Sequence, residues 1–218
     1  ITLSLESSSQ TVSYHLSMPE PHTHYFHVDI NLVRFSEDSV DIKMPVWAPG
    51  SYLVREFSKS VENFRLDNGS SKMINKNTWR IYPNGNSVKI SYDVYAFEMS
   101  VRTSFLDESH AYINGTSLFM YIAEKKELPT TLEITPPAYW KKVSTSLERT
   151  SDKTFSYKAP DYDVLVDSPI EIGNHIEFHF DASGVKHNVA IYGKGNFEIE
   201  ALKIDMAKIV ESCTNVFG

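Results

Sequence analysis

A two-residue alternation of apolar and polar side chains constrains the fold of this chain most. In the run 25–32, Phe26, Val28, Ile30 and Leu32 share one side. The alternation recurs at 40–44, 88–96, 132–134, 176–180 and 189–191. Because successive side chains of a strand point to opposite faces of a sheet, each run predicts a half-buried β-strand.

Turn-forming residues separate these runs, at 67–70, 83–86, 136–137 and 181–184. The pair Asn114-Gly115 lies between apolar residues and predicts a hairpin turn. The 12 Tyr and 12 Phe also favour strands. Short strands at this spacing predict a mainly β fold, an antiparallel β-sandwich or a saddle-like pair of sheets.

The C-terminal segment has a helical period instead. From Asn196 onward, apolar residues recur at steps of three and four, at Ile199, Leu202, Met206, Ile209, Cys213 and Val216. This pattern predicts one amphipathic helix of about five turns. Asn196 suits its N-cap, and Gly218 lies where a C-terminal cap is expected. The change at 192–195 divides a β domain, 1–192, from a linker and helix, 193–218.

The apolar stripe of this helix needs a cover, and two arrangements remain open. The helix either lies across the sheet or is the first helix of a second domain beyond this chain. In the second arrangement we expect residues 1–192 to cover the stripe only in part. The isolated chain then dimerises through the helix or has a mobile helix.

Charge and composition exclude several classes of protein. A net charge of −7 argues against nucleic-acid binding, which depends on clustered Lys and Arg. No apolar run approaches the ~20 residues that span a bilayer. The single cysteine, Cys213, forms no internal disulfide, which favours a cytoplasmic location. An exported protein without disulfides fits too, and a leader before Ile1 remains possible.

The histidine pattern predicts no metal site or catalytic residue in this chain. No His-Glu-x-x-His motif, in which two histidines on a helix share one zinc, occurs in the sequence. His175 and His179 lie four residues apart on a predicted strand, about 13 Å from each other, and belong to its polar face. His22 and His24 would lie about 7 Å apart on a strand, but the sequence indicates no third ligand.

The segment 44–60 is expected to contain a tight turn at 48–51. Pro49 fixes φ at the second turn position, and Gly50 accepts the positive φ that a type II turn requires at the third. An apolar, extended run follows the turn. We expect aromatic side chains to pack on both sides of it.

Three stretches resemble the glycyl aminopeptidases. The closest resemblance is the string Met-Pro-Val-Trp-Ala-Pro-Gly-Ser-Tyr-Leu-Val-Arg-Glu-Phe at 44–57. The segments 100–119 and 162–173 are similar to that family as well, and the resemblance runs from Pro19 to Gly218. These enzymes are zinc metallopeptidases with a β-rich N-terminal domain, a thermolysin-like catalytic domain and a PDZ domain.

This resemblance implies the N-terminal domain of a zinc aminopeptidase and the first helix of its catalytic domain. The partners it implies are that catalytic domain and a peptide substrate with an N-terminal Gly or Ala. The zinc ligands and the general base would lie beyond this chain. By analogy, Asn114 and Gly115 line the substrate cleft, with Tyr52, Arg55 and Arg102 as further candidates.

An alternative of another class is a stand-alone β-sandwich module without catalytic activity. It would bind peptide or carbohydrate through an exposed aromatic platform formed by Trp47, Tyr52, Trp79 and Trp140. Exposed aromatics clustered on a sheet face would favour this alternative. An exposed apolar face on the C-terminal helix would favour the peptidase domain.

Overall fold

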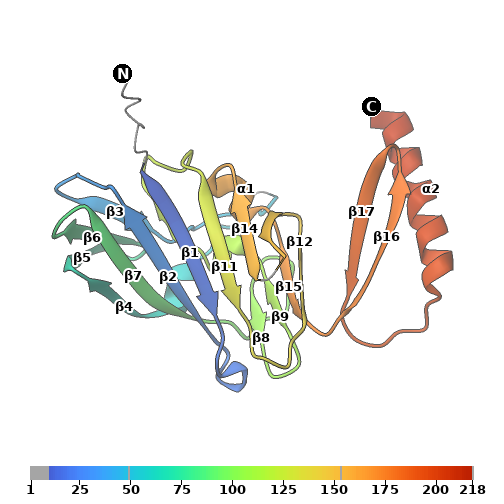
Figure 1. Cartoon of the computed structure of the whole chain (residues 1–218), viewed down its shortest axis with the longest axis horizontal. Coiled ribbons are helices and arrows are strands. Elements are labelled where there is room, and N and C mark those ends of the chain that lie inside the picture. The colour runs from blue at the N-terminus through green and yellow to red at the C-terminus, as the bar shows by residue number, and fades with distance from the viewer. Residues whose placement is uncertain (1–9, 49, 153, 218) are drawn as a thin grey trace, which may run out of the picture. The chain divides into compact units, whose positions relative to one another are not determined.

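The computed structural model describes residues 10–217 apart from Pro49 and Lys153. The chain divides into two compact units, Ile1–Ile172 and Gly173–Gly218. Each unit has an apolar cluster of its own, and Figure 1 shows the elements that form them. No helix of the described residues is both long and apolar enough to span a membrane.

The largest sheet of the first unit, sheet A, has the strand order β13-β14-β11-β1-β2-β7-β4. Its strands are β1 (Thr11–Ser17), β2 (Tyr25–Val33), β4 (Val61–Asp67), β7 (Ser87–Tyr95), β11 (Thr130–Thr135), β13 (Glu148–Ser151) and β14 (Phe155–Ala159). Neighbouring strands of sheet A run antiparallel except β1 and β11, which run parallel.

The two faces of sheet A confirm the predicted alternation. Ile30 on β2 lies opposite Ile90 on β7, and both are buried in the core. One residue away, Asp29 lies opposite Ser91 on the outer face, where the Ser91 hydroxyl donates to the Asp29 carboxylate at 2.6 Å. Polar groups of neighbouring strands therefore pair on one face, while apolar groups pack on the other.

Two four-stranded sheets complete the first unit. Sheet B has the order β10-β3-β6-β5, and sheet C the order β12-β15-β9-β8. Sheet B consists of β3 (Val40–Lys43), β5 (Gly69–Asn75), β6 (Thr78–Pro83) and β10 (Tyr121–Ile122). Sheet C consists of β8 (Phe105–Leu106), β9 (Ala111–Ile113), β12 (Lys142–Thr145) and β15 (Ile170–Gly173).

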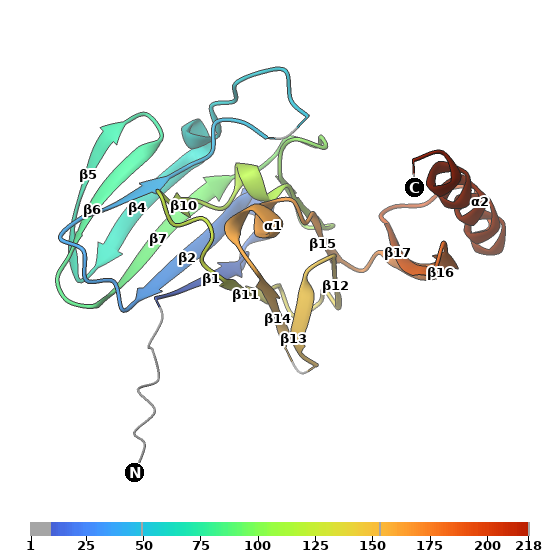
Figure 2. The ribbon, with the colours of Figure 1, turned by 90° about the horizontal axis from the view of Figure 1, so that it is seen from above.

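Apolar side chains from all three sheets form a single core cluster. Ile42 and Ile81 enter it from sheet B, and Ile113 and Ile172 from sheet C, each without exposed surface. The predicted mainly β fold is confirmed, and Figure 2 shows the sheets from above. The first unit also has short helices that the sequence pattern did not predict. They are η1 (Pro21–Thr23), η2 (Phe57–Ser60), η3 (Gly115–Ser117) and α1 (Tyr162–Val166).

The segment 118–120 crosses the core without belonging to a strand. Leu118, Phe119 and Met120 have no exposed surface, so their backbone groups have no access to water. The amides of Leu118 and Phe119 both donate to the carbonyl of Gly115, at 3.1 and 2.8 Å. The amide of Met120 and three carbonyls need other partners, because a buried backbone group without a hydrogen bond is costly.

Three buried tyrosine hydroxyls supply these partners. Tyr92 on β7 donates to the first carbonyl of 118–120 and accepts from the Met120 amide, both at 3.0 Å. Tyr162 on α1 donates to the second carbonyl at 2.7 Å, and Tyr14 on β1 donates to the third at 2.8 Å. Every backbone N–H and C=O of the segment is therefore paired. Burial raises the pKa of all three tyrosines above the ordinary value.

The second unit is a hairpin covered by a helix. The hairpin pairs β16 (Ile176–Ala182) with β17 (Val185–Ile191), and α2 (Ile199–Phe217) packs on β16. Phe178, Phe180 and Ala182 form its buried face, as the alternation predicts. The helix residues packed on that face are Ile199, Leu202, Met206, Ala207 and Val210.

The predicted helix is confirmed, with differences at both ends. It begins at Ile199, and the carbonyl of Glu198 accepts from the Leu202 amide at 3.0 Å, so Asn196 is not the N-cap. No helix residue is buried, which confirms partial cover of the stripe. Ile209 is 63% exposed because it lies off the contacting face. Cys213 is exposed because the contacts end at Val210, and the expected cap at Gly218 lies outside the described residues.

The two units divide the chain earlier than the change in composition at 192–195. The structural division falls after Ile172, because the hairpin residues pack with α2 into one apolar cluster. The domain boundary in a longer protein stays a prediction. It places 1–192 in the N-terminal domain and 193–218 in the linker and first helix of the next domain.

We expect Tyr92→Phe to lower the free energy of unfolding by about 2–4 kcal/mol. The change removes one hydroxyl and leaves two buried backbone groups unpaired, each at a cost of about 1–3 kcal/mol. Urea denaturation measures the loss. The control is Tyr25→Phe, whose exposed hydroxyl donates to Glu62 at 2.9 Å, and we expect it to cost less than about 1 kcal/mol. Equal, small losses in both variants would contradict the role of Tyr92.

Glu171 on β15 gives the stability of the first unit a pH dependence. It lies opposite Tyr112 on β9, and its buried Oε1 has no hydrogen-bond partner among the described residues. Burial raises the pKa of this carboxyl from 4.5 to about 7. The folded state therefore favours the protonated form of Glu171. The stability that this protonation contributes is lost as the pH rises from 4.5 through 7.

We expect the free energy of unfolding to fall by about 1–2 kcal/mol through Glu171 across this pH range, since remaining water contact screens the charge. Urea denaturation at pH 4.5, 5.5, 6.5 and 7.5 measures the fall. Glu171→Gln should abolish this pH dependence, whereas Glu133→Gln, at an exposed site on β11, should retain it. The same pH dependence in wild type and Glu171→Gln would contradict this account.

Candidate functional site

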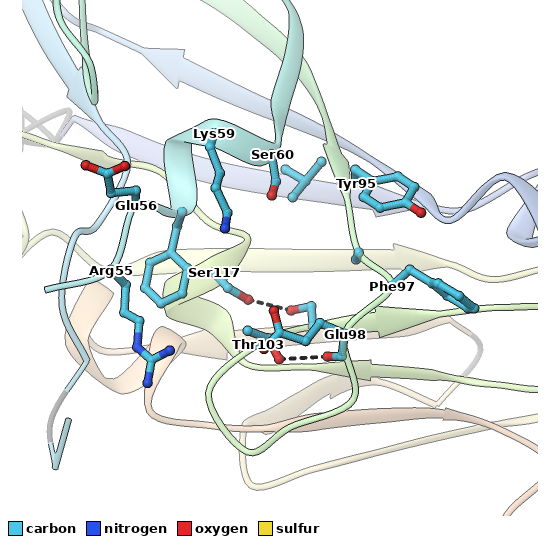
Figure 3. A pocket seen from close by; sticks show the side chains of 13 residues that line it. Arg55, Glu56, Lys59, Ser60, Tyr95, Phe97, Glu98, Thr103 and Ser117 are labelled. Atoms are coloured by element: carbon cyan, nitrogen blue, oxygen red, sulfur yellow. Dashed lines mark hydrogen bonds between the residues drawn. The ribbon is translucent and has the colours of Figure 1, made fainter. Parts of the chain in front are cut away.

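A cavity of about 310 Å³ opens where β7 leaves sheet A. Its lining comes from 55–57, 59–60 and 94–98, from Thr103 and Ser104, and from Ser117. Loops far apart in the sequence thus meet around one space, and Figure 3 shows their side chains. All of these residues belong to the first unit.

Hydroxyl groups form the floor of the cavity. The Oγ atoms of Ser104 and Ser117 lie 2.7 Å apart within hydrogen-bonding reach, and both residues are buried. The Asn114 carbonyl lies within reach of both, 3.3 Å from the Ser104 Oγ and 2.9 Å from the Ser117 Oγ, so the two hydroxyl protons are used within the floor. The floor is therefore polar and continuous with the backbone that precedes the buried segment 118–120.

Asn114 is an N-cap and not part of the predicted hairpin turn. Its side-chain oxygen accepts from the amide of Thr116 at 3.1 Å, and this cap starts η3 instead of a second strand. Its Nδ2 donates to the carbonyl of Val101 at 2.9 Å. Gly115 lies against α1, where a Cβ would be 2.6 Å from the Cα of Val166. Both residues hold the floor in place from beneath.

Two cationic side chains belong to one wall of the cavity. Lys59 on η2 points its ammonium into the space, toward Ser117 (Figure 3). Arg55 also lines the cavity, and its buried Nε has no hydrogen-bond partner among the described residues. The neighbouring Glu56 forms an ion pair with Lys76, which lowers the pKa of the Glu56 carboxyl. No carboxylate among the described residues forms an ion pair with Arg55 or Lys59.

Exposed apolar side chains concentrate on one loop beside the cavity and on the end of β7 with the loop that follows it. They are Tyr52, Leu53 and Val54 on the first and Tyr95, Phe97, Met99 and Val101 on the second. We call these seven residues the apolar rim. Phe97 is fixed by ring contacts, at 3.8 Å to His24 and 5.3 Å to Phe105 between centroids. The rim is an extensive apolar surface in water, which usually marks a binding or interaction site.

The turn at 48–51 is confirmed, but the residues after it are no strand. The Ser51 amide donates to the Ala48 carbonyl at 3.1 Å, and Gly50 has φ of 77°, while Pro49 lies outside the described residues. Tyr52 does not pack on the turn, because it is 101% exposed. Trp47 lies on one side of the turn, where its indole donates to the Ser51 carbonyl at 2.8 Å, so local bonds hold this loop.

The structure brings some of the predicted site residues together. Arg55 lines the cavity, Asn114 and Gly115 support its floor, and Tyr52 belongs to the apolar rim. Arg102 is exposed on the loop of the rim and does not line the cavity. Sequence reasoning missed Lys59, Ser104, Ser117 and Phe97. Only the proximity of Ser104 and Ser117 to the resembling segment 100–119 could have indicated them.

Burial removes half of the aromatic platform that the binding-module alternative requires. Trp79 and Trp140 are only 8% and 3% exposed and belong to the core cluster. Trp79 stacks on Phe64 with 5.1 Å between centroids, so its surface is used in packing. Trp47 and Tyr52 remain exposed, but they lie on the loop beside the cavity and not on a sheet face.

The histidines do not form a strand pair. His24 ends η1 in a left-handed conformation, and its Nδ1 is 2.6 Å from the Leu106 carbonyl, so His22 and His24 share no strand. His175 is buried, with its Nε2 at 3.3 Å from Glu177, whereas the sequence placed it on an exposed polar face. Among residues 10–217 without 49 and 153, no three His, Cys, Asp or Glu side chains form a group that could hold a metal.

Two comparisons define what kind of protein contains this cavity. The chain is similar to a crystal structure of an aminopeptidase N family protein from Idiomarina loihiensis, with a TM-score of 0.87 and 31% identity. The match covers 92% of this chain and 36% of that protein, so this chain spans about a third of its relative's length. The comparison with curated proteins gave no match.

The family model for the peptidase M61 N-terminal domain matches residues 13–174. This chain therefore belongs to the M61 peptidase family, and the matched residues are its N-terminal domain. The resemblance to the glycyl aminopeptidases is confirmed at the level of this β-rich domain.

We expect Gly115→Ala to lower the free energy of unfolding by about 1–3 kcal/mol, because the added Cβ overpacks the contact with Val166. The control is Gly184→Ala, where a Cβ meets no atom within 4 Å, although its φ of 74° adds backbone strain. The added Cβ would meet the Cα, the carbonyl oxygen and the Cβ of Val166, which Val166→Ala keeps, so that change should not recover the stability of Gly115→Ala. Thermal unfolding measures the losses, and a loss in Gly115→Ala no larger than in Gly184→Ala would contradict close packing at Gly115.

Proposed function

We propose that this chain is the non-catalytic N-terminal domain of a zinc aminopeptidase that releases small N-terminal residues, Gly or Ala. In this proposal the apolar rim and the cavity face the substrate cleft and form one of its walls. Membership in the M61 peptidase family supports a peptidase domain without catalytic residues of its own. The similarity to an aminopeptidase N family protein supports the reaction class.

The single observation that carries the proposal is the exposure of the apolar rim beside the cavity. Val54 and Val101 are each 73% exposed, and Leu53 is 62% exposed. Burying a large apolar side chain contributes about 1.5–3 kcal/mol, so seven such residues leave much unused free energy. A catalytic domain that covers part of the rim would gain this free energy of burial. A bound peptide would make apolar contacts with the remainder of the rim.

Zinc belongs to the proposal but not to the residues of this chain. The sequence has no His-Glu-x-x-His motif, and the described residues offer no suitable group of ligands. Zinc, its ligands and the general base are therefore proposed for the remainder of a longer protein, together with a PDZ domain. Within this chain we propose positioning of the peptide by the rim and cavity, with no bond-breaking step.

Exposed apolar residues of α2 offer a second contact for the proposed catalytic domain. Ile204, Ile209, Val216 and Phe217 are 56–86% exposed. We propose that the domain after this chain covers these residues in the longer protein. In the isolated chain, a second copy can cover them instead, and sedimentation would then detect a dimer that Ile209→Glu disrupts.

We expect Val101→Ser to lower kcat/KM for a Gly- or Ala-peptide about 3- to 10-fold in the full-length protein that contains this domain. Val101 would contact the peptide or position the cleft, whereas Val33, 40% exposed at the end of β2, belongs neither to the apolar rim nor to the cavity. Val33→Ser should therefore change kcat/KM less than about twofold. Steady-state kinetics with equal zinc content measures both. Unchanged kinetics in Val101→Ser, or no cleavage of Gly- and Ala-peptides by the wild type, would contradict the proposal.

A further inference from the structure

We propose that the cavity of the first unit binds the carboxylate of a small molecule of peptide origin, either a free amino acid or the C-terminus of a short peptide. Arg55 and Lys59 would bind the carboxylate, and the hydroxyl floor would accept from the amino group of the same molecule. This site goes beyond the proposed function. It also does not depend on it, because this chain alone forms the cavity.

The cationic wall lacks an anion. Lys59 is exposed, its side chain has no hydrogen bond or ion pair with another described residue, and its ammonium points into the cavity (Figure 3). The Nε of Arg55 is buried and unpaired among the described residues. A buried charged donor without a partner is costly, whereas a carboxylate bound to it forms strong, charge-assisted bonds. The nearest acid in sequence, Glu56, is already paired with Lys76.

The backbone holds both cations in position. The Arg55 amide donates to the Val46 carbonyl at 2.5 Å, which ties the loop to the residues after β3. Lys59 belongs to η2, and its amide donates to the Glu56 carbonyl at 3.1 Å. Phe57, between the two, is buried in the core cluster and anchors the segment. The side chains therefore extend from a fixed backbone.

The floor complements the amino group of such a ligand. Ser104 and Ser117 are held 2.7 Å apart at their Oγ atoms, and Thr103 lies beside them on the same side of the cavity. The Thr103 hydroxyl donates to the Glu98 carbonyl at 2.7 Å, which fixes the loop that carries it. The protons of these hydroxyls are already donated within the chain, so the hydroxyls can accept from the ammonium group of the ligand.

Size and the remaining lining limit the ligand. Pockets for drug-sized molecules measure about 300–1,000 Å³, and this cavity of about 310 Å³ lies at the low end. Ala96 and Phe97 supply an apolar wall for a short aliphatic part. The carboxylate of Glu98 lines the cavity as well, so a ligand that also carries an amine fits better than a dianion. A zwitterion, an amino acid or a dipeptide, meets all of these features.

Isothermal titration calorimetry on the 218-residue chain at pH 7 tests the proposal. The probes are glycylglycine, glycine and acetate, each compared with the matching amide, glycylglycinamide, glycinamide or acetamide. We expect the best carboxylate probe to bind at least tenfold more tightly than its amide. Preference for glycylglycine assigns the site to a peptide terminus, and preference for glycine assigns it to a free amino acid. Equal binding of acid and amide, or no binding of any carboxylate at 10 mM, would overturn the proposal.

Variants tie binding to the cationic wall. Lys59→Gln and Arg55→Gln should each weaken carboxylate binding about tenfold or more, because each removes one charge-assisted bond. Lys72→Gln is the matched control, since Lys72 is an exposed lysine on β5 away from the cavity. Circular dichroism and thermal unfolding verify that each variant is folded. Unchanged affinity in folded Lys59→Gln and Arg55→Gln, or an equal loss in Lys72→Gln, would also overturn the proposal.

Discussion

The first unit depends on the hydrogen bonds by which Tyr14, Tyr92 and Tyr162 satisfy the buried segment 118–120. This segment has no strand partner, and without these hydroxyls its carbonyls would lie unpaired in the apolar core. The tyrosines come from β1, β7 and α1, so one backbone segment connects sheet A with the last helix of the unit. Because Ser117 immediately precedes the segment, the floor of the cavity is fixed by the core.

Much of the fold could be predicted from the sequence because its cause is local. A strand with one buried face must alternate, so the residues around Ile30 and Ile90 identify β2 and β7 without knowledge of their partners. The change to a helical period identified α2 for the same reason. The parallel pairing of β1 with β11 could not be predicted, because it joins residues more than a hundred positions apart. The covered face of α2 differs from the predicted stripe at Ile209, because contact with the hairpin determines which helix residues are covered.

The candidate site was less predictable because its geometry is made by distant loops. Asn114-Gly115 suggested a hairpin turn, but the Asn114 side chain caps η3, and a Cβ at Gly115 would overlap α1. Arg55 was selected through resemblance alone, and Lys59 had no sequence signal. Its position became meaningful only when the fold placed it above Ser117 and left it without an anion. Unpaired charge facing a cavity is a property of the tertiary structure.

Native-state hydrogen exchange at the Met120 amide tests most directly whether the buried tyrosines fix the cavity floor. This amide donates to the Tyr92 hydroxyl at 3.0 Å instead of to a strand. We predict exchange only through global unfolding, with the same free energy of opening as the Ile90 amide in the centre of β7. Exchange through local opening, with a free energy several kcal/mol below that of Ile90, would contradict the account, because the floor would then open independently of the core.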